Sequence, residues 1–385
     1  MRFRASLLVF SLISAGFVWL GCSDEEGGAA PASSGAKDAS VNDAPAAVTD
    51  RDADSAPPVS LEPYRIVGRF DSRDPAGPRF GWPGTQVIAR FTGDTISVDL
   101  ADTSNEDQFD VSIDGKEPTL LDVDQQEKKT YELAKGLGAG EHTLVLTKRT
   151  ESSVGETQLI KINATLVGTP PPPSRRIEMV GDSITAGYGV LGTDETCGFS
   201  PETEDEPLAW GALAAKELNA VHASIAWSGI GVYEDDEDNR TNQMPERYKR
   251  ALATDPASTW TASLFEPDVI VIGLGTNDFA GDPPGDSFGA KTTEFVAAVR
   301  AAHPSSNIVL ATSPMLEGQN KADQKKAFEA TIQARKTAGD TKVTLLDIDT
   351  TTEAEGFGCD YHPSKATQTR MSKALVAHVK PLTGW

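Results

Sequence analysis

The order of hydrophobic and polar residues changes at residues 170–173, where four prolines stand together. Upstream, between residues 64 and 167, short runs such as 95–100 and 142–146 alternate hydrophobic with polar side chains and are separated by glycine-containing turns. Alternation with a period of two is typical of strands that bury one face. This half of the chain is therefore expected to fold as an all-β sandwich of antiparallel strands, with a jelly roll as the predicted topology.

Downstream of Arg176 the apolar residues form continuous runs instead. Five such runs, which we interpret as strands, cover residues 177–180, 221–226, 269–274, 308–312 and 344–348. Continuous runs are typical of parallel strands buried on both faces. Apolar residues elsewhere recur at helical spacing, as in Met371, Leu375 and Val379. The pattern predicts a doubly wound, flavodoxin-like α/β/α domain of three layers, with its ligand site at the carboxyl ends of the strands.

The first residues have the pattern of an export signal. Arg2 and Arg4 precede an apolar run over residues 7–20, and Cys22 follows shortly after it. This order is typical of a bacterial lipoprotein signal, in which Cys22 is lipidated and anchors the protein to a membrane, in the periplasm or at the cell surface. Trp19 departs from the usual signal, so ordinary secretion stays open as the alternative. No other stretch of the sequence is long and apolar enough to span a bilayer.

These patterns divide the chain into five segments. Residues 1–21 are the predicted signal peptide. Residues 22–60 are a predicted disordered tether, because they contain too few large apolar side chains to offset their ordering entropy. The β-sandwich is expected over residues 61–169, a proline-rich linker over 170–175 and the flavodoxin-like α/β/α domain over 176–385.

The charge of the chain bears on its possible ligands, and its cysteines bear on a possible disulfide. The formal net charge of −22 argues against nucleic acid. An acidic run at residues 234–238 lacks the spacing of a calcium-binding loop, and we expect neither a metal nor a cofactor. If Cys22 is lipidated, Cys197 and Cys359 remain as an even pair in an oxidising compartment. We predict a disulfide between them; the alternative is two free, buried thiols.

Three residues in short motifs are suited to acyl transfer. Ser183 follows the first strand of the α/β domain, where it is either a nucleophile or a helix-capping serine. Asn277 follows the third strand, and its side-chain amide is suited to donate a hydrogen bond to an oxyanion. His362 lies in a loop before the last predicted helix and is suited to act as a general base, although a lone histidine is more often structural. The three residues together indicate a serine esterase.

The other oxyanion donors are expected to be backbone N–H groups. The N–H of Ser183 lies at the start of a predicted helix, where the helix dipole favours an anion. After the second predicted strand, a glycine allows the backbone to approach a reacting carbonyl closely. We select Gly231 for this role, with Gly229 as the competing candidate and a plain turn as the structural alternative.

The α/β part of the chain resembles the SGNH hydrolase superfamily through Ser183, Asn277 and His362 in their motifs. The usual superfamily pattern places an aspartate three residues before the histidine. Cys359 occupies that position here, and Asp360 lies two residues before His362. The resemblance therefore leaves two possibilities open. Either Asp360 orients the imidazole from this different register, or a backbone carbonyl does so and the catalytic group is a Ser-His dyad.

A more specific resemblance covers nearly the whole expected fold. Five segments look like those of family 2 carbohydrate esterases, namely residues 68–71, 78–84, 197–204, 225–229 and 358–363. This resemblance implies an N-terminal jelly roll joined to an SGNH domain. It also implies an enzyme that removes acetyl groups from plant polysaccharides, such as xylan or glucomannan. The unusual position of Asp360 agrees with it, since members of the family vary there.

Aromatic residues in predicted loops are candidates for contact with a sugar ring, because aromatic faces pack on apolar sugar faces. Trp260 and Tyr361 are the preferred candidates, with core packing as the default for each. The sandwich is expected to brace the hydrolase domain rather than to bind glycans. Two alternatives to a polysaccharide deacetylase stay open: an inactive surface glycan-binding lipoprotein, and an SGNH lipase or esterase acting on other acyl esters.

Overall fold

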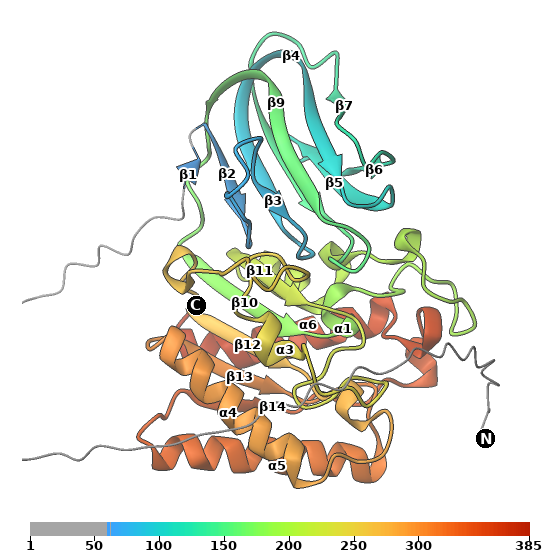
Figure 1. The fold of residues 1–385 in the computed structure, drawn as a ribbon, viewed down its shortest axis with the longest axis vertical. Coiled ribbons are helices and arrows are strands. Elements are labelled where there is room, and N and C mark those ends of the chain that lie inside the picture. Colours follow the sequence, from blue (N-terminus) through green and yellow to red (C-terminus); the bar gives the residue numbers. More distant parts are fainter. Residues whose placement is uncertain (1–59, 62) are drawn as a thin grey trace, which may run out of the picture. The chain divides into compact units, whose positions relative to one another are not determined.

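The computed structural model describes residues 60–61 and 63–385. The predicted signal peptide, the lipidation site Cys22 and nearly all of the predicted tether lie outside the described residues. The described strands form two sheets, one antiparallel and one parallel (Figure 1). The parallel sheet begins at Arg175, just after the prolines at residues 170–173.

The N-terminal domain is built from nine strands that pair in an antiparallel manner. Their bounds are β1 Ser60–Leu61, β2 Tyr64–Val67, β3 Arg79–Phe80, β4 Gln86–Asp102, β5 Asp107–Ile113, β6 Thr119–Val123, β7 Lys129–Ala134, β8 Glu141–Lys148 and β9 Thr157–Gly168. The first part of β4 pairs with β2 and β8, and its last part pairs with β7 and β9. Alternate residues of β4, such as Val98 and Leu100, point into one apolar core. The predicted antiparallel β-sandwich domain is therefore confirmed.

The C-terminal domain contains a five-stranded sheet in the order β11-β10-β12-β13-β14 (Figure 1). The strands are β10 Arg175–Gly181, β11 Ala220–Ala226, β12 Val269–Gly273, β13 Asn307–Ala311 and β14 Val343–Leu346. All neighbouring pairs are parallel. The first strand in the sequence lies inside the sheet, with the second on one side of it and the third on the other. This is the doubly wound order in which ligands bind at the carboxyl ends of the strands, where the strand order reverses.

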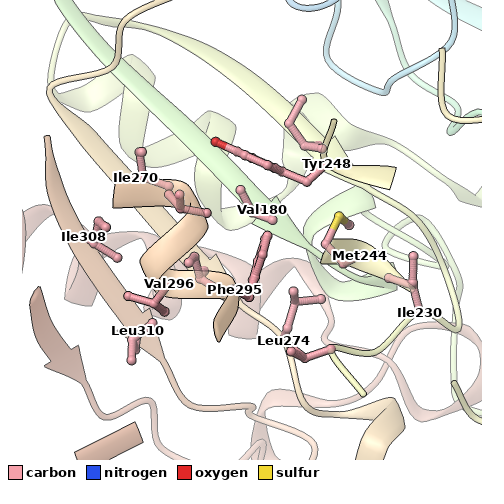
Figure 2. Packing of buried hydrophobic residues seen from close by; sticks show 14 of the residues in the cluster. Val180, Ile230, Met244, Tyr248, Ile270, Leu274, Phe295, Val296, Ile308 and Leu310 are labelled. Atoms are coloured by element: carbon pink, nitrogen blue, oxygen red, sulfur yellow. The ribbon is translucent and has the colours of Figure 1, made fainter. Parts of the chain in front are cut away.

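Helices cover both faces of this sheet, as alternate residues of its strands show. Ile270 and Ile272 of β12 pack with aromatic residues of α4 and α5, in the cluster drawn in Figure 2. Val269 and Val271 of the same strand pack on the opposite face with residues of α2 and α6. The helices are α1 Ser183–Ala186, α2 Trp210–Glu217, α3 Met244–Arg247, α4 Asp286–Ala302, α5 Gly318–Thr337 and α6 Lys365–Thr383. The predicted α/β/α architecture is confirmed.

Six short 3₁₀ helices lie in the connections of the C-terminal domain. They are η1 Pro201–Thr203, η2 Glu206–Leu208, η3 Ala262–Leu264, η4 Asn277–Phe279, η5 Glu353–Glu355 and η6 Cys359–Tyr361. Two of them, η4 and η6, lie in the segments that carry the predicted site residues. None of the helices within residues 63–385 has the length and apolar character that crossing a bilayer requires.

Buried polar contacts join the two domains. Arg69 of the sandwich forms an ion pair with Glu178 of β10 at 3.1 Å, and both side chains are 1% exposed. Tyr248 donates its hydroxyl to the same carboxylate at 2.5 Å. Trp82 of the sandwich is fully buried in the cluster that contains Val180 of β10. Removing one partner of a buried ion pair typically costs about 3–5 kcal/mol, so these contacts hold the domains in a defined arrangement.

Candidate active site

Ser183 lies where β10 ends and α1 begins, at the carboxyl edge of the parallel sheet. Asp182 caps the helix by accepting a hydrogen bond from the N–H of Ile184 at 3.0 Å. Burial raises the pKa of the Asp182 carboxyl to about 7. The N–H of Ser183 has no hydrogen-bond partner within the described part of the chain. This donor is therefore free to bind a ligand at the strand end.

His362 lies between η6 and α6 and faces the serine. Its Nε2 is 2.8 Å from Oγ of Ser183. Its Nδ1 lies 3.2 Å from the carbonyl oxygens of both Cys359 and Asp360. These carbonyls accept a hydrogen bond from an Nδ1–H, which leaves the Nε2 lone pair directed at the serine hydroxyl. Loss of solvent around the ring lowers the imidazole pKa to about 4, so the ring is uncharged at neutral pH and its Nε2 is free to accept a proton.

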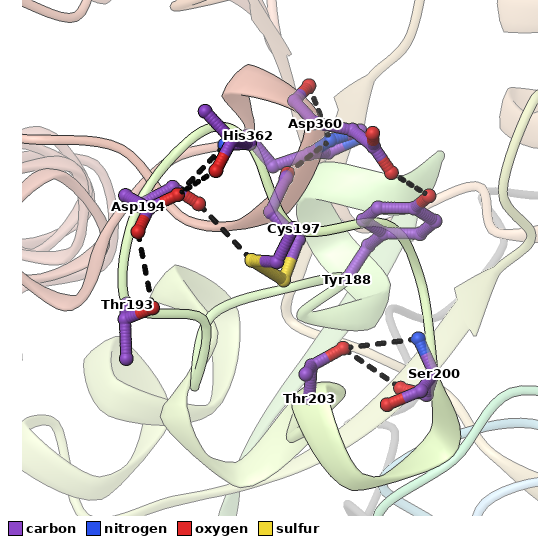
Figure 3. Close-up of a disulfide and its surroundings, with 10 residues drawn as sticks. Tyr188, Thr193, Asp194, Cys197, Ser200, Thr203, Asp360 and His362 are labelled. Carbon is purple, nitrogen blue, oxygen red and sulfur yellow. Dashed lines mark hydrogen bonds between the residues drawn. A yellow bond between two sulfur atoms is a disulfide. The ribbon is translucent and has the colours of Figure 1, made fainter.

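The Asp360 carboxylate does not reach the imidazole. It accepts a hydrogen bond from the hydroxyl of Tyr188 at 2.7 Å, and it accepts none from His362 in the described residues (Figure 3). The backbone turns here through two residues in the left-handed region, Asp360 at φ 51° and Tyr361 at φ 61°. Of the two possibilities left open by the sequence, the geometry favours orientation of the imidazole by backbone carbonyls.

Tyr188 was not identified from the sequence. Its ring stacks on the imidazole of His362 with centroids 4.1 Å apart, and on its other side it stacks with Phe199 at 4.7 Å. The phenol also fixes the Asp360 side chain, and burial raises the pKa of Tyr188, so the phenol stays a donor. Its position five residues after Ser183 was the available signal, because residues close to a nucleophile in sequence often remain close in space.

A disulfide joins the two loops that flank the Ser183–His362 pair. Cys197 and Cys359 are bonded, and the N–H of Asp360 donates to the carbonyl of Cys197 at 2.9 Å (Figure 3). Gly189 lies against Cys359 with φ 60°, and a Cβ at that position would lie 2.8 Å from the Cβ of Cys359. The disulfide therefore ties the loop after Ser183 to the turn that carries His362.

The predicted oxyanion glycine has to be corrected. The N–H of Gly231 donates to Oε1 of Gln243 at 2.9 Å, so it is not available to a substrate. A Cβ on Gly231 would lie 1.8 Å from the carbonyl of Glu234 and 2.6 Å from Oδ2 of Asp278. Close packing around this position therefore explains why it is a glycine. The competing candidate, Gly229, has an N–H without a partner among the described residues.

Asn277 begins η4 and lies next to this loop. Its side-chain Nδ2 donates to the carbonyl of Ile230 at 2.8 Å, which uses one of its two N–H bonds and leaves the other for a ligand. The following residue, Asp278, accepts hydrogen bonds from the N–H groups of Val232, at 3.0 Å, and Tyr233, at 2.7 Å. Burial raises the pKa of Asp278 to about 6. The segment after β12 therefore holds the segment after β11 in place.

Comparison with known proteins identifies the family. Residues 66–173 match the carbohydrate esterase 2 N-terminal domain, and residues 179–370 match the GDSL-like lipase/acylhydrolase family. A solved family 2 carbohydrate esterase from Clostridium thermocellum, in complex with cellohexaose, is 33% identical. That match covers 84% of this chain and 99% of the other, with a TM-score of 0.79. This chain belongs to the family 2 carbohydrate esterases.

Two curated relatives of this family 2 esterase have named activities. Cellulase/esterase CelE of Acetivibrio thermocellus is 35% identical over 328 residues, which cover 83% of this chain but 39% of CelE. An acetylxylan esterase/glucomannan deacetylase of Cellvibrio japonicus is 28% identical, and the match covers 83% of this chain and 89% of the relative. The predicted family and enzyme class, a carbohydrate esterase, are confirmed.

The two aromatic candidates of this family 2 esterase lie in different surroundings. Tyr361 directly precedes His362 and is 62% exposed. Trp260 packs edge-on against Phe70 at 6.2 Å and lines a cavity of about 560 Å³ that neither His362 nor Ser183 lines. Of the two, Tyr361 is therefore the one placed beside the Ser183–His362 pair.

Proposed function

We propose that this carbohydrate esterase removes O-acetyl groups from plant polysaccharides such as xylan or glucomannan. The observation that carries the proposal is the contact of 2.8 Å between Oγ of Ser183 and Nε2 of His362, whose imidazole pKa is lowered to about 4. A neutral imidazole at this distance is suited to take the serine proton as the hydroxyl attacks. The named activity of the relative from Cellvibrio japonicus supports acetyl as the acyl group.

In the proposed reaction, Oγ of Ser183 bonds to the acetyl carbon while its proton passes to Nε2 of His362. The carbonyl oxygen becomes an oxyanion, and the N–H groups of Ser183 and Gly229 with the side-chain amide of Asn277 are the proposed donors to it. As the ester bond breaks, His362 returns the proton to the sugar oxygen. A water molecule, deprotonated by His362, then hydrolyses the acetyl-enzyme to acetate and free Ser183.

Tyr361 is the proposed contact for the sugar ring. Its exposed ring directly precedes His362, where a polysaccharide whose acetyl group lies at Ser183 has to pass. Aromatic faces pack on the apolar faces of sugars, so Tyr361→Ala is expected to raise KM on acetylated xylan. The same substitution should change hydrolysis of 4-nitrophenyl acetate much less, because that ester has no sugar ring. Equal effects on both substrates would contradict this role.

Acetate release from acetylated xylan and acetylated glucomannan tests the proposed function. We expect release by the wild type and none above background from Ser183→Ala, with an unchanged melting temperature for the variant. A folded wild type that binds these glycans but releases no acetate would support the inactive glycan-binding alternative. Faster turnover of 4-nitrophenyl esters with long acyl chains than of the acetate would support the lipase alternative.

We also propose that the protein is exported and anchored through a lipid on Cys22. The order of Arg2, Arg4, the apolar run and Cys22 supports this, and the disulfide of Cys197 with Cys359 fits an oxidising compartment. Wild type expressed in a bacterial host should partition with membranes and incorporate a labelled fatty acid. Cys22→Ser should remove the label, and a wild type without label would contradict the anchor.

A further inference from the structure

The turn between β8 and β9 of the sandwich is buried although its residues are polar. Connecting turns normally lie at the surface, where water satisfies their polar groups. In this turn, residues 149–156, Arg149 is 7% exposed and Glu151 is 1% exposed. Polar groups that are buried need protein partners, and the hydrolase domain provides several of the partners of this turn.

Several contacts link the turn to the hydrolase domain, among them three made by Arg149 and Glu151. Arg149 pairs with Oδ2 of Asp205 at 2.7 Å. The N–H of Glu151 donates to Oε2 of Glu204 at 2.9 Å. In the third contact, Oε2 of Glu151 accepts a hydrogen bond from the N–H of Ser228 at 2.7 Å. The last contact differs from the others, because Ser228 directly precedes Gly229, whose N–H is a proposed oxyanion donor.

The segment of residues 227–231, called the oxyanion loop below, has a partner for every backbone N–H except one. Trp227 donates to the carbonyl of Gly181 at 3.3 Å and Ile230 to that of Trp227 at 3.4 Å. Gly231 donates to Gln243, and Ser228 donates to Glu151. Within the described residues, only the N–H of Gly229 is left without an acceptor. The surrounding bonds thus fix the loop so that one donor stays open.

We propose that Glu151 of the sandwich is a positioning residue of the esterase, which holds the Ser228 N–H and thereby aims the Gly229 N–H at the oxyanion. The inference rests on the proposed function of the Ser183 site. Its consequence is that the sandwich supplies part of the order of the active site, in addition to bracing the hydrolase domain.

The carboxyl group of Glu151 can accept the hydrogen bond from the Ser228 N–H whether it is ionised or protonated. Burial raises the pKa of both Glu151 and Glu204, whose carboxyl groups are neighbours inside the protein. A carboxyl group that is protonated still accepts a hydrogen bond through its carbonyl oxygen. Glutamine offers the same oxygen at the same distance along the side chain. A methionine of similar length offers no comparable acceptor.

These properties define three informative variants of Glu151 and a control variant in the same turn. Glu151→Met and Glu151→Ala remove the acceptor, and Glu151→Gln retains it. Glu156 is the matched control, because it is 5% exposed, lies in the same turn and accepts a hydrogen bond from the hydroxyl of Thr254 in the hydrolase domain at 2.6 Å. Thr254 is not in the oxyanion loop. Glu156→Ala therefore breaks a contact between the domains without touching that loop.

The first readout is the kinetics of 4-nitrophenyl acetate hydrolysis by full-length protein. Loss of an oxyanion donor costs about 10²- to 10³-fold in kcat, and a misaimed donor should cost part of that. We expect kcat to fall at least tenfold in Glu151→Met with KM within about twofold of wild type. Glu151→Gln should recover at least a third of the wild-type kcat, and Glu156→Ala should keep both constants within about twofold.

The second readout does not depend on activity. Hydrogen exchange in peptides that cover residues 226–232 should accelerate in Glu151→Met and stay at the wild-type rate in Glu156→Ala and Glu151→Gln. If Glu151→Ala does not fold, Glu151→Met and Glu151→Gln still decide the question, because they keep the volume of the side chain.

Each outcome has one meaning. An unchanged kcat in a folded Glu151→Met, or an equal loss in Glu156→Ala, would overturn the positioning role. A loss confined to KM would do the same. A wild type without hydrolysis would count against the proposed function, and in that case the exchange rate of the oxyanion loop alone would support or overturn the inference.

Discussion

The Asp360→Asn variant separates a triad from a dyad. In the structure, the Asp360 carboxylate is bonded to the hydroxyl of Tyr188, and the imidazole Nδ1 faces the backbone carbonyls of Cys359 and Asp360. Asparagine removes the charge and leaves both carbonyls in place. It also tolerates the left-handed backbone at this position, φ 51°, better than alanine would, so the turn should be preserved.

The expected loss follows from what the substitution removes. A hydrogen bond to a charged group contributes about 1.5–3 kcal/mol, and each 1.36 kcal/mol is about tenfold in rate. Even if Asp360 stabilised the imidazolium as strongly as such a bond, kcat would fall roughly 10- to 160-fold. Its carboxylate raises the imidazole pKa less than burial lowers it and less than the backbone carbonyls raise it, so we expect a value near the lower end. Loss of a true triad acid costs about 10⁴-fold.

The assay is kcat for 4-nitrophenyl acetate in wild type, Asp360→Asn and His362→Ala. Tyr188→Phe is the matched control, because it removes the donor to Asp360 and retains the ring that stacks on the imidazole. We expect Asp360→Asn and Tyr188→Phe to show similar losses, both far smaller than that of His362→Ala. A loss in Asp360→Asn equal to that in His362→Ala would refute the dyad and make Asp360 the third catalytic residue.

Three further predictions concern pH and the disulfide. Because loss of solvent lowers the pKa of His362 to about 4, kcat/KM should keep at least half its plateau value down to about pH 4.5, whereas a half-loss near pH 6.5 would contradict the neutral base. Replacing both Cys197 and Cys359 by serine should lower the free energy of unfolding in urea by about 2–5 kcal/mol, and an unchanged midpoint and slope would show that the bond does not stabilise the fold. Burial raises the pKa of Asp107 and Asp182 to about 7, so the native state holds protons that the unfolded chain releases above about pH 4. Their contribution to stability is present at low pH and is lost as pH rises through about 7, so between about pH 5 and 7 the melting temperature of the wild type should fall more, or rise less, with pH than that of Asp182→Asn; an identical pH dependence of the two proteins would contradict the assignment.

The fold was largely predictable because the buried faces of strands determine the spacing of apolar residues in the sequence. The run at residues 269–274 has no polar side chain, and β12, Val269–Gly273, does have helices on both of its faces. Alternation at residues 95–100 likewise corresponds to the last part of β4, where Val98 and Leu100 face the core. Periodicity does not show that Trp82 of the sandwich is buried in a core of the hydrolase domain, because that contact is set by how two domains meet.

Within the site, residues that directly follow a predicted strand or lie in the terminal loop were easier to predict than the residues that contact them. Ser183, Asn277 and His362 follow from strand ends and a terminal loop, and the structure places Ser183 and His362 within 2.8 Å of each other. Tyr188 lies in a connection without regular structure, so apart from its closeness to Ser183 in the sequence no pattern marks its stacking on His362. The role of Asp360 was open for a similar reason, since two successive residues with positive φ turn its carboxylate toward Tyr188.

The choice of Gly229 over Gly231 as the proposed oxyanion donor depends on which backbone N–H is free. Both glycines follow β11, and both satisfy the requirement for close approach of the backbone. What separates them is which N–H already has an acceptor, and the acceptors belong to other parts of the chain: Gln243 for Gly231 and Glu151 for Ser228. The N–H that stays free is therefore the one for which the fold provides no acceptor, and one of the acceptors for its neighbours comes from the sandwich. The two domains therefore have to be considered together when the active site of such an esterase is altered.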